Sequence, residues 1–392
     1  RGVAPELAAA AGVFVHGLAG ERAGNRQPWG VVAGDIADPG FPERVVDASI
    51  AVWGRLDAVV NNAGISAYAD TGGNGGALTI NGSVAVLGGG SSGSLNLSGN
   101  TINVTGNLSA TGNGSEADAS IDIGAFKGIT IGGDVIASQQ GGSSASIFIK
   151  NYLSGTINIT GRVEANAASS SASVDIIGQR IIVGGGVKVI AGEGGRADLN
   201  VQGMTGVRLG NVEVQADNDF ASLRILNGYE SSYGSSTLSL GSGDIVLTGG
   251  LRAKSGASAL IEVRNEFGAL TVAGNVFAER QANALQSTGF SQILLQGLST
   301  TLNGRVTATS AVGPAIVDLV AGEDNGFLPV NGGSLTLNGA VLASAAAGLT
   351  EIKLYGGGIN VNGGNLNISN TIIANSTSGG DFSGNQPVTS TN

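Results

Sequence analysis

A nine-residue pattern returns along most of this chain and constrains the fold more than any other feature. Apolar residues alternate with other residues, glycine stands at the fifth position, and a small residue often closes the unit, as in LTINGSVAV and INVTGNLSA. The anchor glycines are Gly82, Gly106, Gly133, Gly161, Gly185, Gly210, Gly249, Gly274, Gly304, Gly339 and Gly363. A fixed period of about 20 to 50 residues is typical of solenoid proteins.

A second apolar unit follows each first one, for example SLNL around Leu95, SIDI around Ile121 and SVDI around Val174. Successive anchor glycines are 24 to 28 residues apart, except for intervals of 39, 30 and 35 that end at Gly249, Gly304 and Gly339. The three long intervals predict insertions into a coil of about 25 residues.

The alternation points one side of every strand inward, and the inward residues are almost all Ile, Val, Leu or Ala. One coil cannot bury such a face, whereas coils stacked about 4.8 Å apart pair their backbone groups and close an apolar column. We therefore predict an all-β chain, with a right-handed parallel β-helix over 77–370 on the order of 50 Å long. A β-sandwich or barrel is the alternative, but antiparallel folds do not need one motif repeated at a near-constant distance.

Each anchor glycine stands between two apolar pairs, where the chain must turn from one side of the coil to the next. We expect no room for a Cβ at these corners. Asn and Thr recur at outward positions, and we expect them to form side-chain ladders between equivalent sites of stacked coils.

The composition changes near residue 70. Both tryptophans, Trp29 and Trp53, and the only histidine, His16, precede it, whereas all lysines follow it. The Gly-rich stretch 69–76 predicts a flexible linker, and the Ser-, Thr-, Asn- and Gly-rich end at 371–392 predicts a disordered tail.

The repeats contain no His and no Cys, which excludes a histidine base, a Ser-His-Asp triad and a zinc site there. A carboxylate mechanism needs two acids about 5 to 10 Å apart across a cleft. We interpret the outward acids as a solvated face because they fall in separate coils. They are Asp122, Asp175, Glu262 and Asp318. The prediction is a protein that is not an enzyme, with no catalytic and no metal-binding residues.

The net charge of −10 and the absence of a basic run argue against a nucleic-acid partner. No apolar stretch reaches the roughly 18 residues of a membrane-spanning helix, so we predict no transmembrane segment. The start at Arg1 has no signal-peptide pattern. The lack of cysteine fits an exported protein as well as a cytosolic one.

The insertions are the expected contact sites, because loops projecting from a rigid solenoid are where partners usually bind. They carry the aromatic residues Tyr229, Tyr233, Phe290 and Phe327. Tyrosine is favoured at contacts with sugars and proteins, although structural variation explains such loops equally well. The acidic stretch before Phe327 fits a solvated loop better than a weak cation site.

The first 68 residues alternate strand and helix patterns, which predicts a partial α/β, Rossmann-like fragment ahead of the β-helix. DIAD at 35–38 followed by GRLDAVVNNAGI at 54–65 closely resembles the short-chain dehydrogenase/reductase family. The resemblance implies an NAD(P) site with Gly2 in the phosphate-binding turn, Asp35 and Ile36 beside the adenine, and a nicotinamide groove lined by three more residues. Those three are Asn62, Ala63 and Gly64.

This segment departs from the family in two places. Ala4 stands where the last glycine of the phosphate-binding turn is expected, and no tyrosine is followed four residues later by lysine. We therefore expect a truncated, catalytically incomplete fragment with a vestigial cofactor site, so that the chain has no cofactor unless this fragment functions. A join between two genes accounts for the fragment; a genuine N-terminal cap on the rod is the alternative.

The repeats resemble the β-helices of filamentous-haemagglutinin-like and autotransporter exoproteins of Gram-negative bacteria. The resemblance implies export through an outer-membrane partner, a secreted or cell-surface location, and adhesion or aggregation through a host or bacterial surface glycan or protein. The alternatives are an NAD(P)-dependent short-chain oxidoreductase remnant and, less favoured, a glycan-processing β-helix enzyme.

Overall fold

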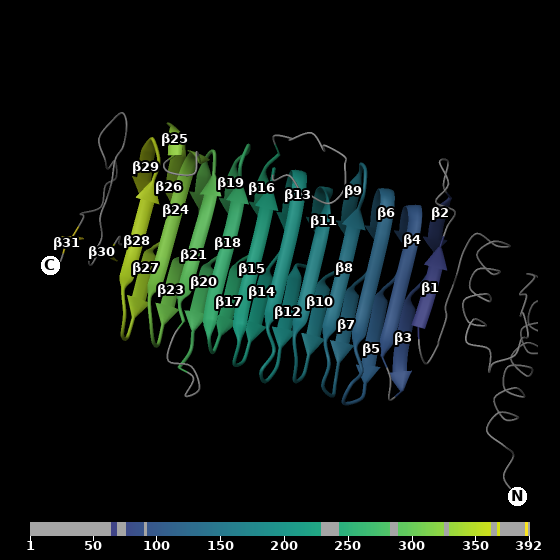
Figure 1. The fold of residues 1–392 in the computed structure, drawn as a ribbon. Coiled ribbons are helices and arrows are strands. Elements are labelled where there is room, and N and C mark those ends of the chain that lie inside the picture. Colours follow the sequence, from purple (N-terminus) through teal and green to yellow (C-terminus); the bar gives the residue numbers. More distant parts are fainter. Residues whose placement is uncertain are drawn as a thin grey trace, which may run out of the picture.

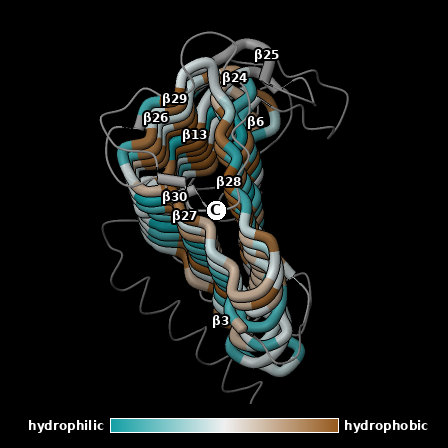
Figure 2. Tube along the Cα trace, turned by 90° about the vertical axis from the view of Figure 1, so that its left-hand side faces the viewer, coloured by the Kyte–Doolittle hydropathy of each residue, from teal (hydrophilic) through white to brown (hydrophobic). Residues whose placement is uncertain are grey.

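The chain folds into a stack of parallel coils. The computed structural model describes residues 64–68, 76–89, 92–228, 243–282, 289–324, 329–361, 367–368 and 389–390. Within these ranges every regular element is a β-strand. Strands lie side by side in chain order along the stack (Figure 1), and the coils superimpose in one elongated outline when viewed along it (Figure 2). The predicted parallel β-helix is confirmed, with about ten turns of about 26 residues; its right-handedness stays a prediction.

Each coil passes through three strands in a constant order, which define face 1, face 2 and face 3. Faces 1 and 2 form one 19-stranded sheet that bends at the corner between them, and face 3 is a ten-stranded sheet. Four strands run round the corner from face 1 to face 2. They are β4 (Gly93–Val104), β6 (Ala119–Ile131), β11 (Ala172–Val183) and β13 (Ala197–Leu209).

The remaining strands belong to single faces. Face 1 contains β1 (Gly64–Tyr68), β8 (Ala145–Asn151), β15 (Phe220–Asn227), β18 (Ser258–Asn265), β21 (Ser291–Gly297), β24 (Ala315–Asp324) and β28 (Thr350–Tyr355). Face 2 contains β2 (Ala77–Ile80), β9 (Thr156–Ile159), β16 (Ile245–Leu247), β19 (Leu270–Val272), β22 (Thr300–Leu302), β26 (Ser334–Leu337) and β29 (Gly358–Val361). Face 3 contains β3 (Val84–Gly89), β5 (Leu108–Asn113), β7 (Val135–Gln139), β10 (Val163–Ala167), β12 (Val187–Ala191), β14 (Val212–Ala216), β17 (Leu251–Ser255), β20 (Val276–Arg280), β23 (Val306–Ser310) and β27 (Val341–Ala345).

Two short strands lie outside this scheme. β25 (Pro329–Gly332) pairs antiparallel with the end of β24, and β30 (Asn367–Ile368) pairs in parallel with β31 (Thr389–Ser390). The rest of the predicted 371–392 tail lies outside the described residues.

The core is one continuous apolar column, as the alternation predicted. In β8 and β12 every second side chain is buried. Val163, Val187 and Val212 stack in register on face 3, each no more than 2% exposed. Because each inward side chain packs on its equivalents in the coils on either side, stability accumulates coil by coil.

The corner between faces 2 and 3 is a ladder of anchor glycines. The Gly106 N–H donates to the Gly82 carbonyl at 3.0 Å, and the Gly133 N–H donates to the Gly106 carbonyl at 3.1 Å. A Cβ on Gly304 would lie 2.5 Å from the carbonyl carbon of Gly274. Of the described anchors only Gly82 has a positive φ, of 144°. Close packing of backbone on backbone therefore requires glycine here, as predicted.

Side chains beside this ladder extend it. The Asn107 Oδ1 accepts from the Asp134 N–H at 2.8 Å, and the Asp134 Oδ1 accepts from the Arg162 N–H at 2.9 Å. The Asn338 Nδ2 donates to the Asn303 Oδ1 at 2.7 Å. The expected ladders thus occur, but several join a side chain to the backbone of the next coil.

The first described strand lies upstream of the predicted start of the repeats. β1 pairs in parallel with the first half of β4, and its Ala67 is fully buried opposite Leu97. The stack therefore takes in residues 64–68, which the sequence analysis assigned to the reductase-like fragment. The preceding residues lie outside the described part of the chain.

Candidate binding faces

Face 3 presents a regular outward row, which we call the central row. Its strands bury alternate side chains, as in β10 and β12, so the second residue of each strand lies on the outward side, although in β23 this residue, Thr307, is only 8% exposed. The parallel register aligns these residues, each three positions after an anchor glycine. The central row comprises Ala85, Ser109, Ile136, Glu164, Lys188, Glu213, Arg252, Phe277, Thr307 and Leu342.

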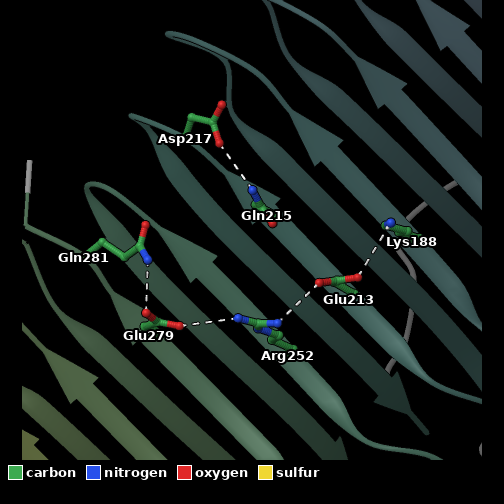
Figure 3. Close-up of polar contacts among 7 residues, drawn as sticks. All are labelled: Lys188, Glu213, Gln215, Asp217, Arg252, Glu279 and Gln281. Carbon is green, nitrogen blue, oxygen red and sulfur yellow. Dashed lines mark hydrogen bonds and ion pairs between the residues drawn. The ribbon is translucent and has the colours of Figure 1, made fainter.

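Charges alternate in the middle of the central row. Figure 3 shows Lys188 directed at Glu213. It also shows Arg252 between Glu213 of the preceding coil and Glu279 of the following coil. The N–O distances are 3.9 Å for Lys188–Glu213, 3.8 Å for Arg252–Glu213 and 3.5 Å for Arg252–Glu279. Exposed ion pairs contribute about 0 to 1 kcal/mol to stability. These long pairs hold the row weakly and leave its charges accessible.

Face 1 places the four acids named from the sequence in a second outward row. The register runs from Asp122 through Phe148 to Asp175, and later from Arg224 and Glu262 through Leu294 to Asp318. They lie in separate coils, as the sequence indicated, and no two of the four acids are in adjacent coils.

Most of these acids have polar neighbours. The Asn200 Nδ2 donates to the Asp175 Oδ1 at 3.0 Å, and the Arg224 Nε donates to the Glu262 Oε2 at 2.8 Å. Burial raises the pKa of Asp318, against the opposing effect of the Lys353 ammonium. The row is a mixed polar surface that is less solvated than the sequence indicated, since the Glu262 side chain is 13% exposed and Asp318 is partly buried.

A small aromatic cluster lies where β6 and β8 approach the corner between faces 1 and 2. The Phe126 and Tyr152 ring centroids are 5.5 Å apart, and the Lys150 Nζ lies 4.8 Å from the Tyr152 centroid. Gly124 makes room, because a Cβ there would lie 3.1 Å from Tyr152 Cε2. Tyr152 is 41% exposed and the next residue, Leu153, 53%. An exposed ring beside an ammonium can stack on an apolar surface and donate hydrogen bonds.

The structure places only part of the predicted contact set. Phe290 packs against Phe220 with ring centroids 6.0 Å apart, at a corner of the coil between faces 3 and 1. The two rings lie two coils apart, and their packing accounts for an aromatic residue at position 290. Tyr229, Tyr233 and Phe327 lie outside the described residues, as do Gly2, Asp35, Ile36, Asn62 and Ala63. Gly64 is the first residue of β1.

The sequence analysis missed the central row and the Tyr152 cluster. Counting three residues on from each anchor glycine reveals the central row, since the turn to face 3 has the same length after every anchor. The Tyr152 cluster carries no comparable signal, because Phe126 and Tyr152 come together only through the stacking of β8 on β6.

The described residues contain no group of three or more His, Cys, Asp or Glu side chains placed to hold a metal ion. They also contain no helix of the length and hydrophobicity needed to cross a membrane. Comparison with known proteins gives no match to a family model, to a curated protein or to a solved structure.

Proposed function

We propose that this chain is the β-helix scaffold of a secreted or cell-surface exoprotein of a Gram-negative bacterium, and that it mediates adhesion or aggregation. Its partner is a host or bacterial surface glycan or protein, and its export uses an outer-membrane partner. The chain has no catalytic role in this proposal.

The main support for the proposal is that the outward side chains of face 3 differ from coil to coil, whereas the inward side chains hardly change. Ile136, Glu164, Lys188 and Phe277 occupy equivalent outward positions, while the inward residues beside them are valine or alanine in each coil. A solenoid of this kind can change its outward side chains coil by coil without altering the core. That property suits a protein whose surface serves recognition.

The Tyr152 cluster adds a local contact site to the proposal. Exposed aromatic side chains are enriched where proteins meet partners. Lys150 and Asp122 supply a donor and an acceptor near the ring, and burial, with a smaller contribution from the charge of Asp122, raises the pKa of Tyr152. This arrangement favours a ligand with both apolar and hydrogen-bonding surfaces, such as a glycan or a protein loop.

Binding of the purified, fluorescently labelled chain to bacterial and epithelial cells tests the proposal. We expect saturable binding that is reduced by Tyr152→Ser. A matched control is Tyr355→Ser, which removes a tyrosine ring from β28 at the other end of the stack. Periodate or protease treatment of the cells separates glycan from protein partners. Absence of saturable binding to any cell type would contradict adhesion.

The alternative function can be tested in the same sample. Trp29 and Trp53 are the only tryptophans, so their fluorescence reports on the reductase-like segment alone. We expect no energy transfer to added NADH or NADPH and no turnover of carbonyl substrates. Saturable quenching by either nucleotide would reopen the oxidoreductase alternative.

A further inference from the structure

The central row of face 3 is self-complementary when read from its two ends. Positions equidistant from its middle carry opposite charges in the two innermost pairs, then two apolar residues, then a serine and a threonine, of which the threonine is buried, and finally two apolar residues. From the middle outward the pairs are Lys188 and Glu213, Glu164 and Arg252, Ile136 and Phe277, Ser109 and Thr307, and Ala85 and Leu342.

This symmetry specifies one way in which two copies can meet. When a second stack runs in the opposite direction with its face 3 on this one, Lys188 meets the partner's Glu213 and Glu164 meets the partner's Arg252. When the stacks run in the same direction, every charge meets its own copy. Like charges placed opposite each other disfavour association, whereas complementary rows favour it.

We infer that face 3 is the docking surface for a second copy of this chain, with the two stacks antiparallel. The interface is isologous, since the same row contributes from both copies. The inference deepens the proposed function, because it identifies a partner for aggregation and the orientation in which that partner binds.

The charges of the row remain available to a partner. Within one chain their N–O distances are 3.3 to 3.9 Å, the shortest joining Arg162 to Glu164, whose side chain is 14% exposed, whereas charge-assisted hydrogen bonds are about 2.7 to 2.9 Å long. Lys188 and Arg252 are 40% and 48% exposed. The fourth residue of each face 3 strand forms a second outward row. This row adds no like-charge contact, because Lys254 would meet the partner's Asn166 and Glu279 would meet the partner's Ser138.

The face is also large enough, and the edge that it shares with face 2 is open. Ten strands of mostly five residues give roughly 700 Å² per copy at the usual strand spacing and rise. Specific protein complexes bury about 800 Å² per partner. The turns between faces 2 and 3 are short in every described coil, so no insertion rises beside that edge.

Sedimentation equilibrium of the whole chain tests the interface. Lys188→Glu places a carboxylate against the partner's Glu213 twice in the symmetric dimer, and we expect the dimer to weaken about tenfold to a hundredfold. The double variant Lys188→Glu/Glu213→Lys restores both intermolecular pairs, and its affinity should return close to that of the unmodified chain.

The double variant also distinguishes a row that pairs two chains from a row that pairs only within one chain. Within one chain it puts like charges side by side, at 164 and 188 and at 213 and 252. Lys188→Glu alone also makes two like-charge contacts within the chain, at 164 and 188 and at 188 and 213. A row that served only internal pairing would therefore be harmed about equally by the two variants, with no recovery in the double variant. Arg208→Glu on face 2 makes the same change of charge and should leave the dimer intact. Thermal unfolding confirms that each variant folds.

Cross-linking tests the orientation, since the chain contains no cysteine. Thr111 and Thr309 lie at equivalent outward positions on β5 and β23, near opposite ends of the stack. A short bismaleimide should join Thr111→Cys chains to Thr309→Cys chains in a mixture and should join neither variant to itself. Self-cross-linking of each variant would show a parallel dimer and overturn the inference.

The inference is also overturned if the unmodified chain stays monomeric at its highest soluble concentration. It is likewise overturned if Lys188→Glu and Arg208→Glu weaken the dimer to the same extent. A chain that dimerises without binding cells would contradict only adhesion to cells, and a monomer that binds cells would contradict only the dimer.

Discussion

The corner between faces 2 and 3 varies less in length than the other two corners of the coil. From β2 to β27, two or three residues join face 2 to face 3 in every described coil. The long connections lie elsewhere. They separate β15 from β16, β20 from β21, and β24 from β26.

The difference follows from what holds each corner. Between faces 2 and 3, backbone packs on backbone, so neither the length nor the residue type of the turn can change freely. Between faces 1 and 2, glycine packs on the neighbouring backbone only in some coils, as at Gly155 and Gly333, and side chains also bond the backbone. The Asn227 Nδ2 donates to the Gly243 carbonyl at 2.8 Å, and the Asn265 Nδ2 donates to the Ala269 carbonyl at 2.8 Å. A corner without the same glycine contact in every coil, and held in part by side chains, tolerates an insertion because the strands on either side stay anchored.

The largest expected effect comes from adding one carbon to the glycine corner. Gly304→Ala places a Cβ against the Gly274 backbone, and we expect a loss of about 3 kcal/mol, the upper range for overpacking. Gly128→Ala is the matched control, because its Cβ would lie 3.6 Å from the Thr156 carbonyl in ordinary contact. Urea unfolding followed by circular dichroism measures both. Equal effects would contradict the distinction between the corners.

A smaller effect is expected where a side chain holds the corner. Asn265→Ala leaves the Gly243 and Ala269 carbonyls and the Asn227 amide without this partner, which should cost about 1 to 3 kcal/mol. Asn158→Ala on the outward side of β9 should cost less than about 0.5 kcal/mol. The same urea series compares them, and an unchanged midpoint for Asn265→Ala would show that the buried amides do not hold this corner.

The outward row of face 1 offers a prediction that depends on pH. Burial raises the pKa of Asp318 above its ordinary value of 3.8, so the folded chain binds this proton more tightly than the unfolded chain. The resulting stability is present below pH 3.8 and is lost as the pH rises through the raised pKa. Asp318→Asn should therefore stabilise the chain at pH 7 by no more than about 0.5 kcal/mol.

The gain from Asp318→Asn should vanish below pH 3.8. Thermal unfolding at pH 3 and pH 7 measures the difference. A variant that is less stable than the unmodified chain at pH 7 would show that the Lys353 charge outweighs burial.

The smallest effect is expected from shortening an insertion. Replacing residues 229–242 with a short Gly-Ser linker should change the free energy of unfolding by less than about 0.5 kcal/mol, since loop closure depends weakly on loop length. Cell binding by the shortened chain then tests whether Tyr229 and Tyr233 contribute. A large loss of stability would show that this insertion supports the stack.

Most of the architecture could be predicted from local pattern. The alternation around Ile102 and Ile129 identifies inward positions, and the glycine after each short run identifies the tight corner. The exceptions are polar residues that point inward. Arg280 and Asn265 are 2% and 1% exposed, although the alternation predicts aliphatic residues at inward positions. Their burial depends on neighbouring coils, which a single repeat does not reveal.

The candidate surfaces were harder to predict because they are made of residues from different coils. The prediction of Tyr229 and Tyr233 rests on a local criterion, namely an aromatic residue in an insertion. No local pattern distinguishes Tyr152, since its contact with Phe126 requires β8 to lie on β6.

The sequence by itself determined the repeating unit, the inward apolar residues and the glycine corner, because strand alternation and the space around a Cβ are properties of a few consecutive residues. The tertiary structure alone decided which outward side chains share a row. Glu164 and Arg252 lie far apart in the sequence, yet occupy equivalent positions on β10 and β17 because hydrogen bonding between stacked coils sets a common register.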